Sequence, residues 1–501
     1  MKKLLETYKV VADEVPATIK IWDVPEENVP IYEITMPEFD VGTKALLVKL
    51  TEDLSRMIPI SVEETTDPKR MEELRKKFFE IAKKEIAKRF PRMREEEVNT
   101  LSGVLLHSMY GLGDVELILS DALLEEIVIN NSLYPIAVYH KKYGWLKTSK
   151  RLTTEEDIYN FSSQIGRKAG RQISLLNPIM DAHLITGDRV ASTLFPISTQ
   201  GNTITIRKFS RSPWNVVTLM KNHGISKEIV AFLWLAIQYE LNVMVAGATA
   251  SGKTSVLNSL VALIPPTQRI LSIEDTREIT LPESLHWNWV PMTSRTANPE
   301  GQGAISMLDL MIAALRMRPD RIIVGEVRRK DQVETMFEAM HTGHSVYTTI
   351  HADTVQQVLR RLLEPPIQIP KTELESLHLI LIQYRDRRKN IRRSLELAEL
   401  LSGGKEEMEV NYLYRWRPRT DTFEKVNQSI RIFEDLNLHT GMTPQEIQKD
   451  LKQKETILQW LLDYQIEDVD VLGKIMKTYY KDPDSILTAA QKKQKPESVV
   501  K

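Results

Sequence analysis

Residues 247–254 read Gly247-Ala248-Thr249-Ala250-Ser251-Gly252-Lys253-Thr254, which fits the pattern G-x-x-x-x-G-K-[ST] of a phosphate-binding loop. In such a loop, the glycines let successive backbone N–H groups turn inward onto phosphate oxygens. Lys253 is placed to reach the β- and γ-phosphates of a nucleotide, and the Thr254 hydroxyl can ligate Mg²⁺. The stretch therefore predicts a site for ATP together with Mg²⁺.

The neighbouring sequence supplies the strand and the helix that such a loop requires. Residues 242–246 form a short apolar run before the loop, and residues 254–264 carry apolar side chains at helical spacing until Pro265 and Pro266. A helix that begins at the loop directs its free N–H groups and the positive end of its dipole at an anion. A chance match in a Gly/Ser loop is the alternative, and the flanking strand and helix argue against it.

Length and composition limit the class of protein. A chain of 501 residues is too long for one core, so we expect two to four domains. The net charge of −1 provides no overall basic field for nucleic acid. The absence of cysteine excludes a disulfide framework, a thiol nucleophile and a Cys-based zinc site. No apolar run approaches the roughly 20 residues of a membrane helix, so we expect a cytoplasmic protein that reaches the membrane through a partner.

The first 104 residues are expected to form an α+β region. The one role that we suggest for this region is docking to a partner. Short β-like pieces alternate with proline-containing turns at residues 18–22, 31–36 and 45–50. Asp67 as N-cap and Pro68 as first residue open a predicted helix, and a second helix covers residues 95–110. The mixed basic and acidic residues of the first helix indicate a solvated face rather than a nucleic-acid face.

Residues 105–212 are expected to form a compact α/β domain. Its predicted strands lie near residues 126–130, 136–139, 189–194 and 203–208. The capping box Thr153-Thr154-Glu155-Glu156 opens a helix that runs to about Lys168. Pro213 and the residues after it form a plausible linker, which places a domain boundary there.

Residues 213–392 alternate strands and helices, which predicts a largely parallel sheet with helices on its faces. After the phosphate loop, we expect strands at 269–273, 321–324 and 345–350 and helices at about 305–316, 332–340 and 354–363. Residues 393–501 are expected to add two strands at 394–400 and 409–416 and then helices, with a frayed polar end from Ala489. One of these helices opens with Thr443-Pro444-Gln445-Glu446, which joins a capping box to a first-turn proline.

Three polar residues lie at the carboxyl ends of strands of the predicted parallel sheet: Glu274, Glu326 and His351. In an open α/β sheet, ligands bind outside the carboxyl ends of the strands. The phosphate loop leaves its own strand at that same edge. We therefore expect the three side chains to converge on the γ-phosphate of ATP although they are far apart in sequence.

We expect Glu326 to orient or deprotonate the attacking water, since phosphoryl transfer depends mostly on positioning and charge neutralisation. Gly325 occupies the place of the usual metal-holding aspartate, so contact with Mg²⁺ falls to Thr254 and to waters held by Glu326. Glu274 can share in positioning water or Mg²⁺, and His351 can sense the γ-phosphate. Two alternatives stay open. Glu274 and Asp275 could simply cap a loop, and His351 could be a structural hydrogen-bonding residue.

These residues resemble the motifs of the secretion ATPase superfamily, the hexameric motors of type II secretion, type IV pili and the archaellum, and more distantly of type IV secretion. The resemblance covers roughly residues 105–400 and rests on Gly247–Thr254 as Walker A, Ile273-Glu274-Asp275 as an acidic box, Ile322–Arg328 as an atypical Walker B, and Thr342–His344 with Thr348–His351 as a histidine box. It implies a RecA-like P-loop ATPase domain preceded by a smaller α/β domain. Upstream, Arg189 and Arg207 lie in stretches that resemble the N-terminal arginine segments of the family, which implies that they reach a nucleotide across a domain or subunit interface.

The resemblance also implies a homo-hexameric ring that acts on a polytopic membrane platform protein and lies peripheral to the cytoplasmic membrane. Bacterial assembly ATPases of this superfamily usually carry a four-cysteine zinc module, which this cysteine-free chain cannot have. The chain also has an extended region from Tyr412 onward. It is therefore more similar to the archaeal branch, which serves archaella, pili or secretion, than to the bacterial assembly ATPases.

Three other functions remain open. A nucleic-acid translocase of the related type IV secretion class is the first, because related folds move DNA and because five arginines cluster at positions 385, 387, 388, 392 and 393. The near-zero net charge argues against it. A small-molecule kinase would need an acceptor pocket. A ring that binds nucleotide without hydrolysing it is disfavoured by the intact Lys253 and Glu326.

Overall fold

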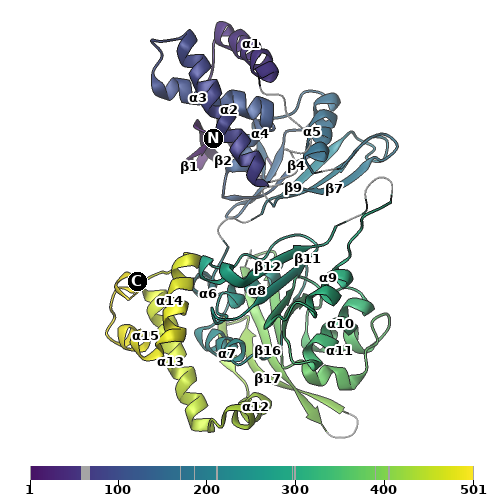
Figure 1. Ribbon diagram of the computed structural model, residues 1–501, viewed down its shortest axis with the longest axis vertical. Coiled ribbons are helices and arrows are strands. Elements are labelled where there is room, and N and C mark those ends of the chain that lie inside the picture. Colours follow the sequence, from purple (N-terminus) through teal and green to yellow (C-terminus); the bar gives the residue numbers. More distant parts are fainter. Residues whose placement is uncertain are drawn as a thin grey trace. The chain divides into compact units, whose positions relative to one another are not determined.

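The structure is a computed structural model that describes residues 2–57, 68–169, 171–184, 187–209, 213–295, 297, 301–389, 391–403 and 407–499 (Figure 1). The chain divides into two compact units, residues 1–211 and 212–501. Each unit contains one nine-stranded sheet. The expected α/β fold is confirmed.

The first unit opens with a hairpin and a layer of helices. Its first elements are β1 (Lys3–Ala12), β2 (Val15–Asp23), β3 (Ile31–Thr35), α1 (Val41–Met57), α2 (Pro68–Arg89) and α3 (Glu95–Tyr110). The strand that we expected at residues 45–50 is wrong, because these residues belong to α1. Leu46, Leu50 and Leu54 recur four residues apart and pack against α2 and α3, which is a helical period. Asp67, the expected N-cap of α2, lies outside the described residues.

The remaining elements of the first unit are α4 (Val115–Ser120), β4 (Leu124–Ile129), β5 (Ala137–His140), β6 (Gly144–Thr148), α5 (Glu155–Lys168), β7 (Ile179–His183), β8 (Arg189–Thr193) and β9 (Thr203–Arg207). The strand order is β1-β2-β3-β6-β5-β4-β9-β8-β7. The parallel pair β3–β6 joins strands from either side of the expected boundary between residues 104 and 105, which itself falls within α3. Helix α5 begins one residue later than expected, with Thr154 as N-cap and Asp157 completing its capping box.

The second unit contains the parallel sheet and its helices. Its elements up to the sheet's last strand are α6 (Val216–Lys221), α7 (Lys227–Gln238), β10 (Val243–Gly247), α8 (Lys253–Val261), β11 (Ile270–Glu274), β12 (Trp289–Thr293), α9 (Met307–Ala314), β13 (Arg321–Val324), α10 (Lys330–His341), β14 (Ser345–Ile350), α11 (Val355–Leu363), β15 (Leu379–Asp386), β16 (Ile391–Gly403), β17 (Glu407–Arg417) and β18 (Thr422–Lys425). The strand order is β12-β11-β13-β14-β10-β15-β16-β17-β18.

This sheet is parallel from β12 to β15 and antiparallel from β15 onward. Strand β16 spans residues 391–403, so the expected boundary between residues 392 and 393 also falls inside a sheet. The parallel part, with helices on both faces, has the architecture of a RecA-like P-loop domain. It brings the carboxyl ends of β10, β11, β13, β14 and β15 to one edge, where the site lies.

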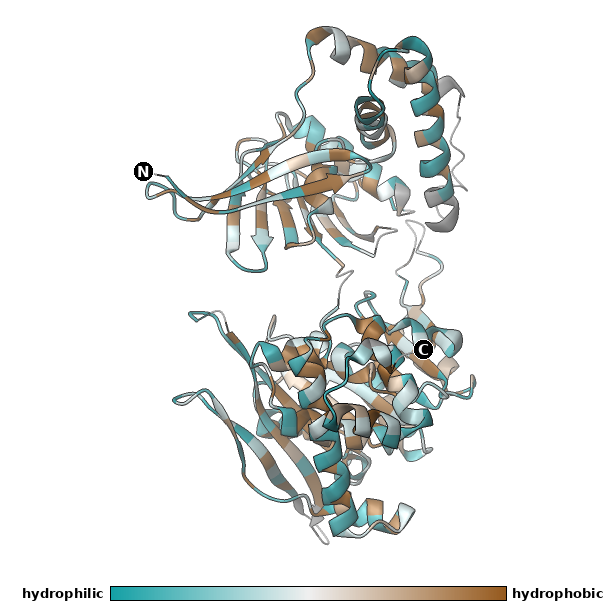
Figure 2. Cartoon of the chain, turned by 90° about the vertical axis from the view of Figure 1, so that its left-hand side faces the viewer, coloured by the Kyte–Doolittle hydropathy of each residue, from teal (hydrophilic) through white to brown (hydrophobic). Residues whose placement is uncertain are grey.

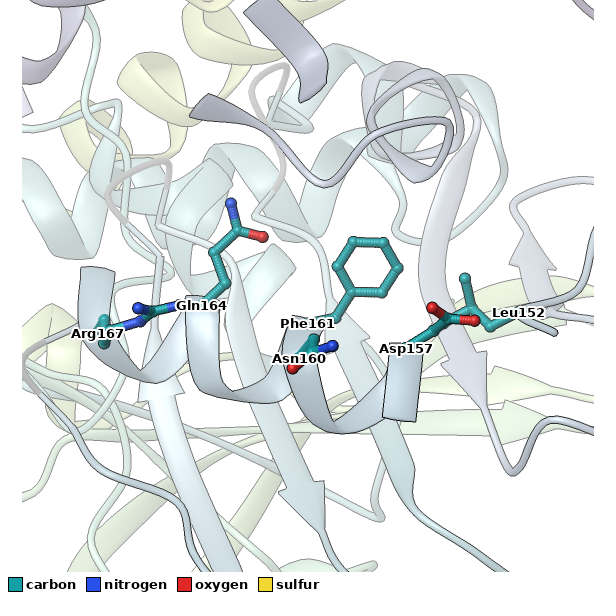
Figure 3. Close-up of a pocket in the computed structure, with 6 residues that line it drawn as sticks. All are labelled: Leu152, Asp157, Asn160, Phe161, Gln164 and Arg167. Atoms are coloured by element: carbon teal, nitrogen blue, oxygen red, sulfur yellow. The ribbon is translucent and has the colours of Figure 1, made fainter. Parts of the chain in front are cut away.

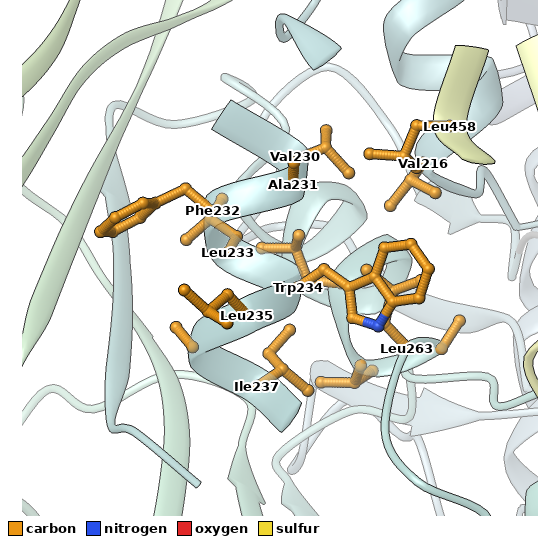
Figure 4. Packing of buried hydrophobic residues seen from close by; sticks show 14 of the residues in the cluster. Val216, Val230, Ala231, Phe232, Leu233, Trp234, Leu235, Ile237, Leu263 and Leu458 are labelled. Atoms are coloured by element: carbon orange, nitrogen blue, oxygen red, sulfur yellow. The ribbon is translucent and has the colours of Figure 1, made fainter. Parts of the chain in front are cut away.

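Both faces of the parallel part of the second sheet are covered. Alternate residues of β10 point to opposite faces, since Val243 and Val245 belong to one apolar cluster and Met244 and Ala246 to another. The first cluster includes α7, whose Trp234 packs near Leu263 and donates a hydrogen bond to the Tyr480 hydroxyl at 3.0 Å (Figure 4). The sheet edge that holds the phosphate loop is thus supported by a core on either side.

The C-terminal helices are α12 (Arg431–Thr440), α13 (Pro444–Asp463), α14 (Val469–Lys481) and α15 (Pro483–Gln491). Thr443 caps α13 in the expected capping box, with Pro444 in its first turn. The prediction of a frayed end from Ala489 onward is wrong for residues 489–494. Ala489 is buried, and Trp460 donates a hydrogen bond to the carbonyl of Gln494 at 2.8 Å.

Hydrophobic residues gather inside each unit, whereas the ends of the hairpins are largely hydrophilic (Figure 2). Within the described ranges, we find no helix that has both the length and the apolar character needed to span a membrane.

Candidate functional site

The phosphate loop joins β10 to α8 and depends on unusual backbone conformations. Gly247 has φ 156°, and a Cβ atom there would lie 2.3 Å from the carbonyl oxygen of Gln383 on β15. Ala250 and Gly252 have φ angles of 62° and 92°, and Gly252 is the N-cap of α8. Such left-handed bends are those in which consecutive N–H groups can face a common anion. Glycine is required at residue 247 because no side chain fits beside β15.

The interior of the loop suits a polar ligand. Ser251 is 1% exposed, and its hydroxyl has no hydrogen-bond partner among the residues that the structure describes. Burying a hydroxyl without a partner is unfavourable, and a phosphate oxygen would satisfy it. Thr254 lies partly buried in the first turn of α8, where the motif requires a ligand for Mg²⁺. These residues therefore fit a nucleotide with its Mg²⁺.

The structure brings Lys253, His351 and Glu326 together from three elements of the sheet edge. The Nζ of Lys253 donates a hydrogen bond to the Ala248 carbonyl at 3.1 Å and lies 3.2 Å from the Nδ1 of His351. The Nε2 of His351 lies 3.0 Å from Oε1 of Glu326. An ammonium group can only donate, so we assign the acceptor role to Nδ1 and the proton to Nε2. The imidazole thereby links the loop lysine to the carboxylate.

Burial and charge set the protonation states of this chain of contacts. Burial lowers the pKa of Lys253 and also that of His351, for which the nearby Lys253 charge acts in the same direction. Burial alone would raise the pKa of Glu326. The hydrogen bond from Arg328 and the charges of His351, Arg328 and Lys253 outweigh it, so the pKa of Glu326 lies below its ordinary value. Glu326 is therefore a carboxylate near neutral pH and His351 is largely neutral.

Arg328 is a site residue for which the sequence analysis predicts no separate role. Its Nη2 lies 2.9 Å from Oε2 of Glu326, and its Nη1 lies 3.5 Å from Oδ2 of Asp275. Asp275 also accepts a hydrogen bond from the Ser294 hydroxyl at 3.0 Å. The signal available in the sequence is that Arg328 comes two residues after Glu326. Both oxygens of Glu326 are therefore held in place, one by His351 and one by Arg328.

Glu274 ends β11, and its hydrogen bonds run to a neighbouring loop and not to Lys253, His351 or Glu326. Its Oε1 accepts hydrogen bonds from the N–H groups of Glu278 and Ile279 at 2.8 and 2.9 Å, so it caps a loop. Its Oε2 is buried without a hydrogen-bond partner among the described residues. Gly325 packs against it, since a Cβ at residue 325 would lie 3.2 Å from the Glu274 Cγ. The loop-capping alternative thus describes one oxygen of Glu274, and the other still needs a ligand.

Glu274 is expected to make stability depend on pH. Burial raises its pKa to about 7 from the model-compound value of 4.5, so the folded protein holds this proton to higher pH than the unfolded chain does. The free energy of unfolding should therefore fall by roughly 3 kcal/mol as the pH rises from below the unfolded pKa to above the folded pKa. Glu274→Gln removes the titration and keeps the Oε1 acceptor. We expect the variant to gain stability relative to the wild type between about pH 5 and pH 8, measured by urea unfolding. A stability difference that is the same at both pH values would contradict the assignment.

Arg189 and Arg207 lie side by side on the sheet of the first unit. They are directly opposite each other on β8 and β9. The Nε and Nη2 of Arg189 donate to the two carboxylate oxygens of Asp181 at 3.0 and 2.5 Å. The structure brings these two arginines together, and their expected role toward a nucleotide stays a prediction.

An open hollow of about 380 Å³ lies along α5 in the first unit, and Leu152, Asp157, Asn160, Phe161, Gln164 and Arg167 line it (Figure 3). It contains none of the predicted site residues, and the phosphate loop belongs to the second unit. Within the described residues, no cluster of His, Asp and Glu side chains forms a metal site. The nucleotide chemistry is therefore assigned to the phosphate loop and not to this hollow.

Residues 185–390 match the protein family described as "Type II/IV secretion system protein". An uncharacterized protein of Methanocaldococcus jannaschii is 33% identical over 393 residues, which cover 77% of this chain and 70% of that protein. The type IV secretion system protein PtlH of Bordetella pertussis is 30% identical over 258 residues, which cover 47% of this chain and 75% of PtlH. Among solved structures, the ATPase DotB of Yersinia pseudotuberculosis is 19% identical with a TM-score of 0.43, and the match covers 74% of this chain and 93% of DotB.

Proposed function

We propose, from the premise that this chain belongs to the type II/IV secretion ATPase superfamily, that it is a hexameric motor that hydrolyses ATP. Its work would be to power the assembly of a pilus- or archaellum-type filament, or protein secretion, across the cytoplasmic membrane. The observation that carries the proposal is the continuous contact from Lys253 of the phosphate loop through His351 to the carboxylate of Glu326. It joins a phosphate-binding group to a group able to activate water at one sheet edge.

The residues of this edge have distinct tasks in the proposed reaction. Lys253 would leave the Ala248 carbonyl and bind the β- and γ-phosphates, and the hydroxyl of Thr254 would hold Mg²⁺, which neutralises phosphate charge. Glu326, ionised and fixed by Arg328, would accept a hydrogen bond from the attacking water. When Lys253 turns toward the phosphates, the Nδ1 of His351 loses its donor. His351 would thereby sense whether the site is filled.

The proposal also includes an assembled ring. Arg189 and Arg207 would reach the nucleotide from the first unit of the same chain or of a neighbouring subunit, and the ring would act on a polytopic membrane platform protein at the cytoplasmic face of the membrane. The Methanocaldococcus relative supports the archaeal branch of the superfamily. The positive charge of the two arginines would offset charge that develops on the phosphates during hydrolysis.

A nucleic-acid translocase is the second candidate, because PtlH is a type IV secretion protein and because of the arginine cluster near β15 and β16. One member of the cluster is engaged within the fold. Arg393 is 6% exposed and donates to both carboxylate oxygens of Asp421 at 2.7 and 2.8 Å. Arg392 contacts the phosphate loop. The cluster therefore offers nucleic acid a smaller basic surface than the sequence indicates.

Release of inorganic phosphate from Mg-ATP, measured with and without added DNA, tests the proposal. We expect turnover that changes less than about twofold on addition of DNA, since the net charge of −1 provides no extended basic field. Turnover that appears only with DNA would favour the translocase. Transfer of the phosphoryl group to a small molecule in place of its release as inorganic phosphate would favour a kinase.

A further inference from the structure

An arginine far from the phosphate loop in sequence reaches it in space. The Nε of Arg392, at the start of β16, donates a hydrogen bond to the carbonyl oxygen of Ala250 at 3.2 Å, across 142 residues of chain. Its Cδ also passes over the next glycine of the loop, 3.4 Å from where a Cβ of Gly252 would lie. Arg392 therefore covers the outer side of the bend between Ala250 and Gly252.

The contacted carbonyl belongs to a non-glycine residue of the loop that has a left-handed conformation. Ala250 has φ 62°, a left-handed conformation that residues with a Cβ adopt only where their surroundings impose it. The carbonyl of Ala250 and the N–H of Ser251 belong to one planar peptide group and point in opposite directions. Holding the carbonyl outward, on Arg392, directs the N–H inward, where it now meets the Ala248 carbonyl at 3.2 Å. That N–H is one of those that a phosphate would use.

Neighbouring contacts fix Arg392 in this position. Arg393, the next residue, forms the double hydrogen bond with Asp421, and this bond holds the Asp421 pKa at about 2. Successive side chains of a strand point to opposite faces, so anchoring Arg393 on one face turns Arg392 to the other. A register shift at Ile382 and Gln383 also bends β16 against β15. Such bulges often lie beside active sites and redirect a side chain.

We propose that Arg392 is a positioning residue that holds the phosphate loop in its anion-binding shape through the carbonyl of Ala250. The inference rests on the proposed function for one point only, that the ligand of the loop is a nucleoside di- or triphosphate. Arg392 lies outside the four sequence motifs of the site, and it makes the start of β16 part of the nucleotide site. Through Arg392, the start of β16 therefore acts on the geometry of the loop.

Binding of ADP and of inorganic pyrophosphate, each measured by calorimetry on the full chain, tests this role. We expect Arg392→Ala to weaken both by about tenfold, the effect of one hydrogen bond from a charged group. Arg392→Lys should restore part of the affinity. The matched control is Arg388→Ala, which removes the same charge from the exposed turn between β15 and β16 and should change both affinities less than about twofold. Steady-state kinetics should show the loss mainly as a raised KM for ATP.

Four outcomes separate the explanations. Equal affinities for Arg392→Ala and Arg388→Ala would overturn the inference. Weaker binding of ADP with unchanged binding of pyrophosphate would also overturn it, because it would place Arg392 at the nucleoside. A wild-type protein that binds neither ligand would refute the proposed function instead. If Arg392→Ala fails to fold, Arg392→Lys and Arg392→Gln carry the test, and equal pyrophosphate affinity for these two and the wild type would overturn it.

Discussion

Replacing Lys253 by alanine is expected to reduce ATP turnover at least about a hundredfold, the loss typical of removing one donor that stabilises transition-state charge. Lys253 is 7% exposed, and its ammonium group lies at the centre of the site, between the loop carbonyl of Ala248 and the ring of His351. Its removal also takes away the cation that the β- and γ-phosphates would meet. Phosphate release under saturating Mg-ATP measures the turnover, and calorimetry with ADP measures the accompanying loss of affinity.

The matched control for this variant is Lys330→Ala. Lys330 is exposed at the start of α10 and forms a helical ion pair with Glu334 at 3.6 Å, so its removal takes the same charge from the same unit. Surface pairs of this kind contribute little to stability. We expect turnover within about twofold of the wild type for this control. Turnover by Lys253→Ala within about tenfold of the wild type would show that the phosphate loop is not the catalytic nucleotide site.

Glu326→Gln is expected to bind nucleotide with nearly unchanged affinity and to lose roughly 10² to 10⁴ in turnover, the range for a general acid or base. The glutamine side chain keeps the size of glutamate and an oxygen that can accept from the Nε2 of His351. The glutamine side chain cannot carry a negative charge. Glu326 carries one near neutral pH, because its pKa lies below the ordinary value. Single-turnover phosphate release, compared with the affinity for ADP, separates the two effects.

Normal hydrolysis by Glu326→Gln would end the assignment of this carboxylate. Glu274 would then be the next candidate, since its second oxygen is buried without a partner in the described part of the chain. In that case, Glu274→Gln should lose turnover. The control is Glu334→Gln, which removes a negative charge from the exposed face of α10. If Glu326 is the catalytic carboxylate, turnover by this control should stay within about twofold of the wild type.

The elements that carry the motifs could be predicted because their signals are local. Strand β10 is an apolar run, the loop has fixed spacing, and α13 begins with a capping box, so each is visible within a few residues. Helix α7 gave no such signal. Its residues from Ile229 to Ile237 are all buried, between the sheet and the C-terminal helices, so it has no polar face to mark a helical period.

The contacts that complete the site could not be predicted in the same way. Arg392 meets Ala250 only because β15 pairs with β10 and the chain then turns back, which depends on the tertiary fold. The predicted strand at residues 45–50 failed for a related reason. Its apolar residues fit either period over so short a window, and packing against α2 and α3 selects the helix.

The most direct test of the central claim is the turnover of Mg-ATP per chain, measured across a range of protein concentrations together with the mass by light scattering. If Arg189 and Arg207 complete the site from a neighbouring subunit, turnover per chain should rise as the protein assembles, and the active species should have the mass of a ring. Turnover that is independent of concentration in a monomer would contradict a site completed across subunits, and with it the account of this chain as a ring-shaped secretion motor.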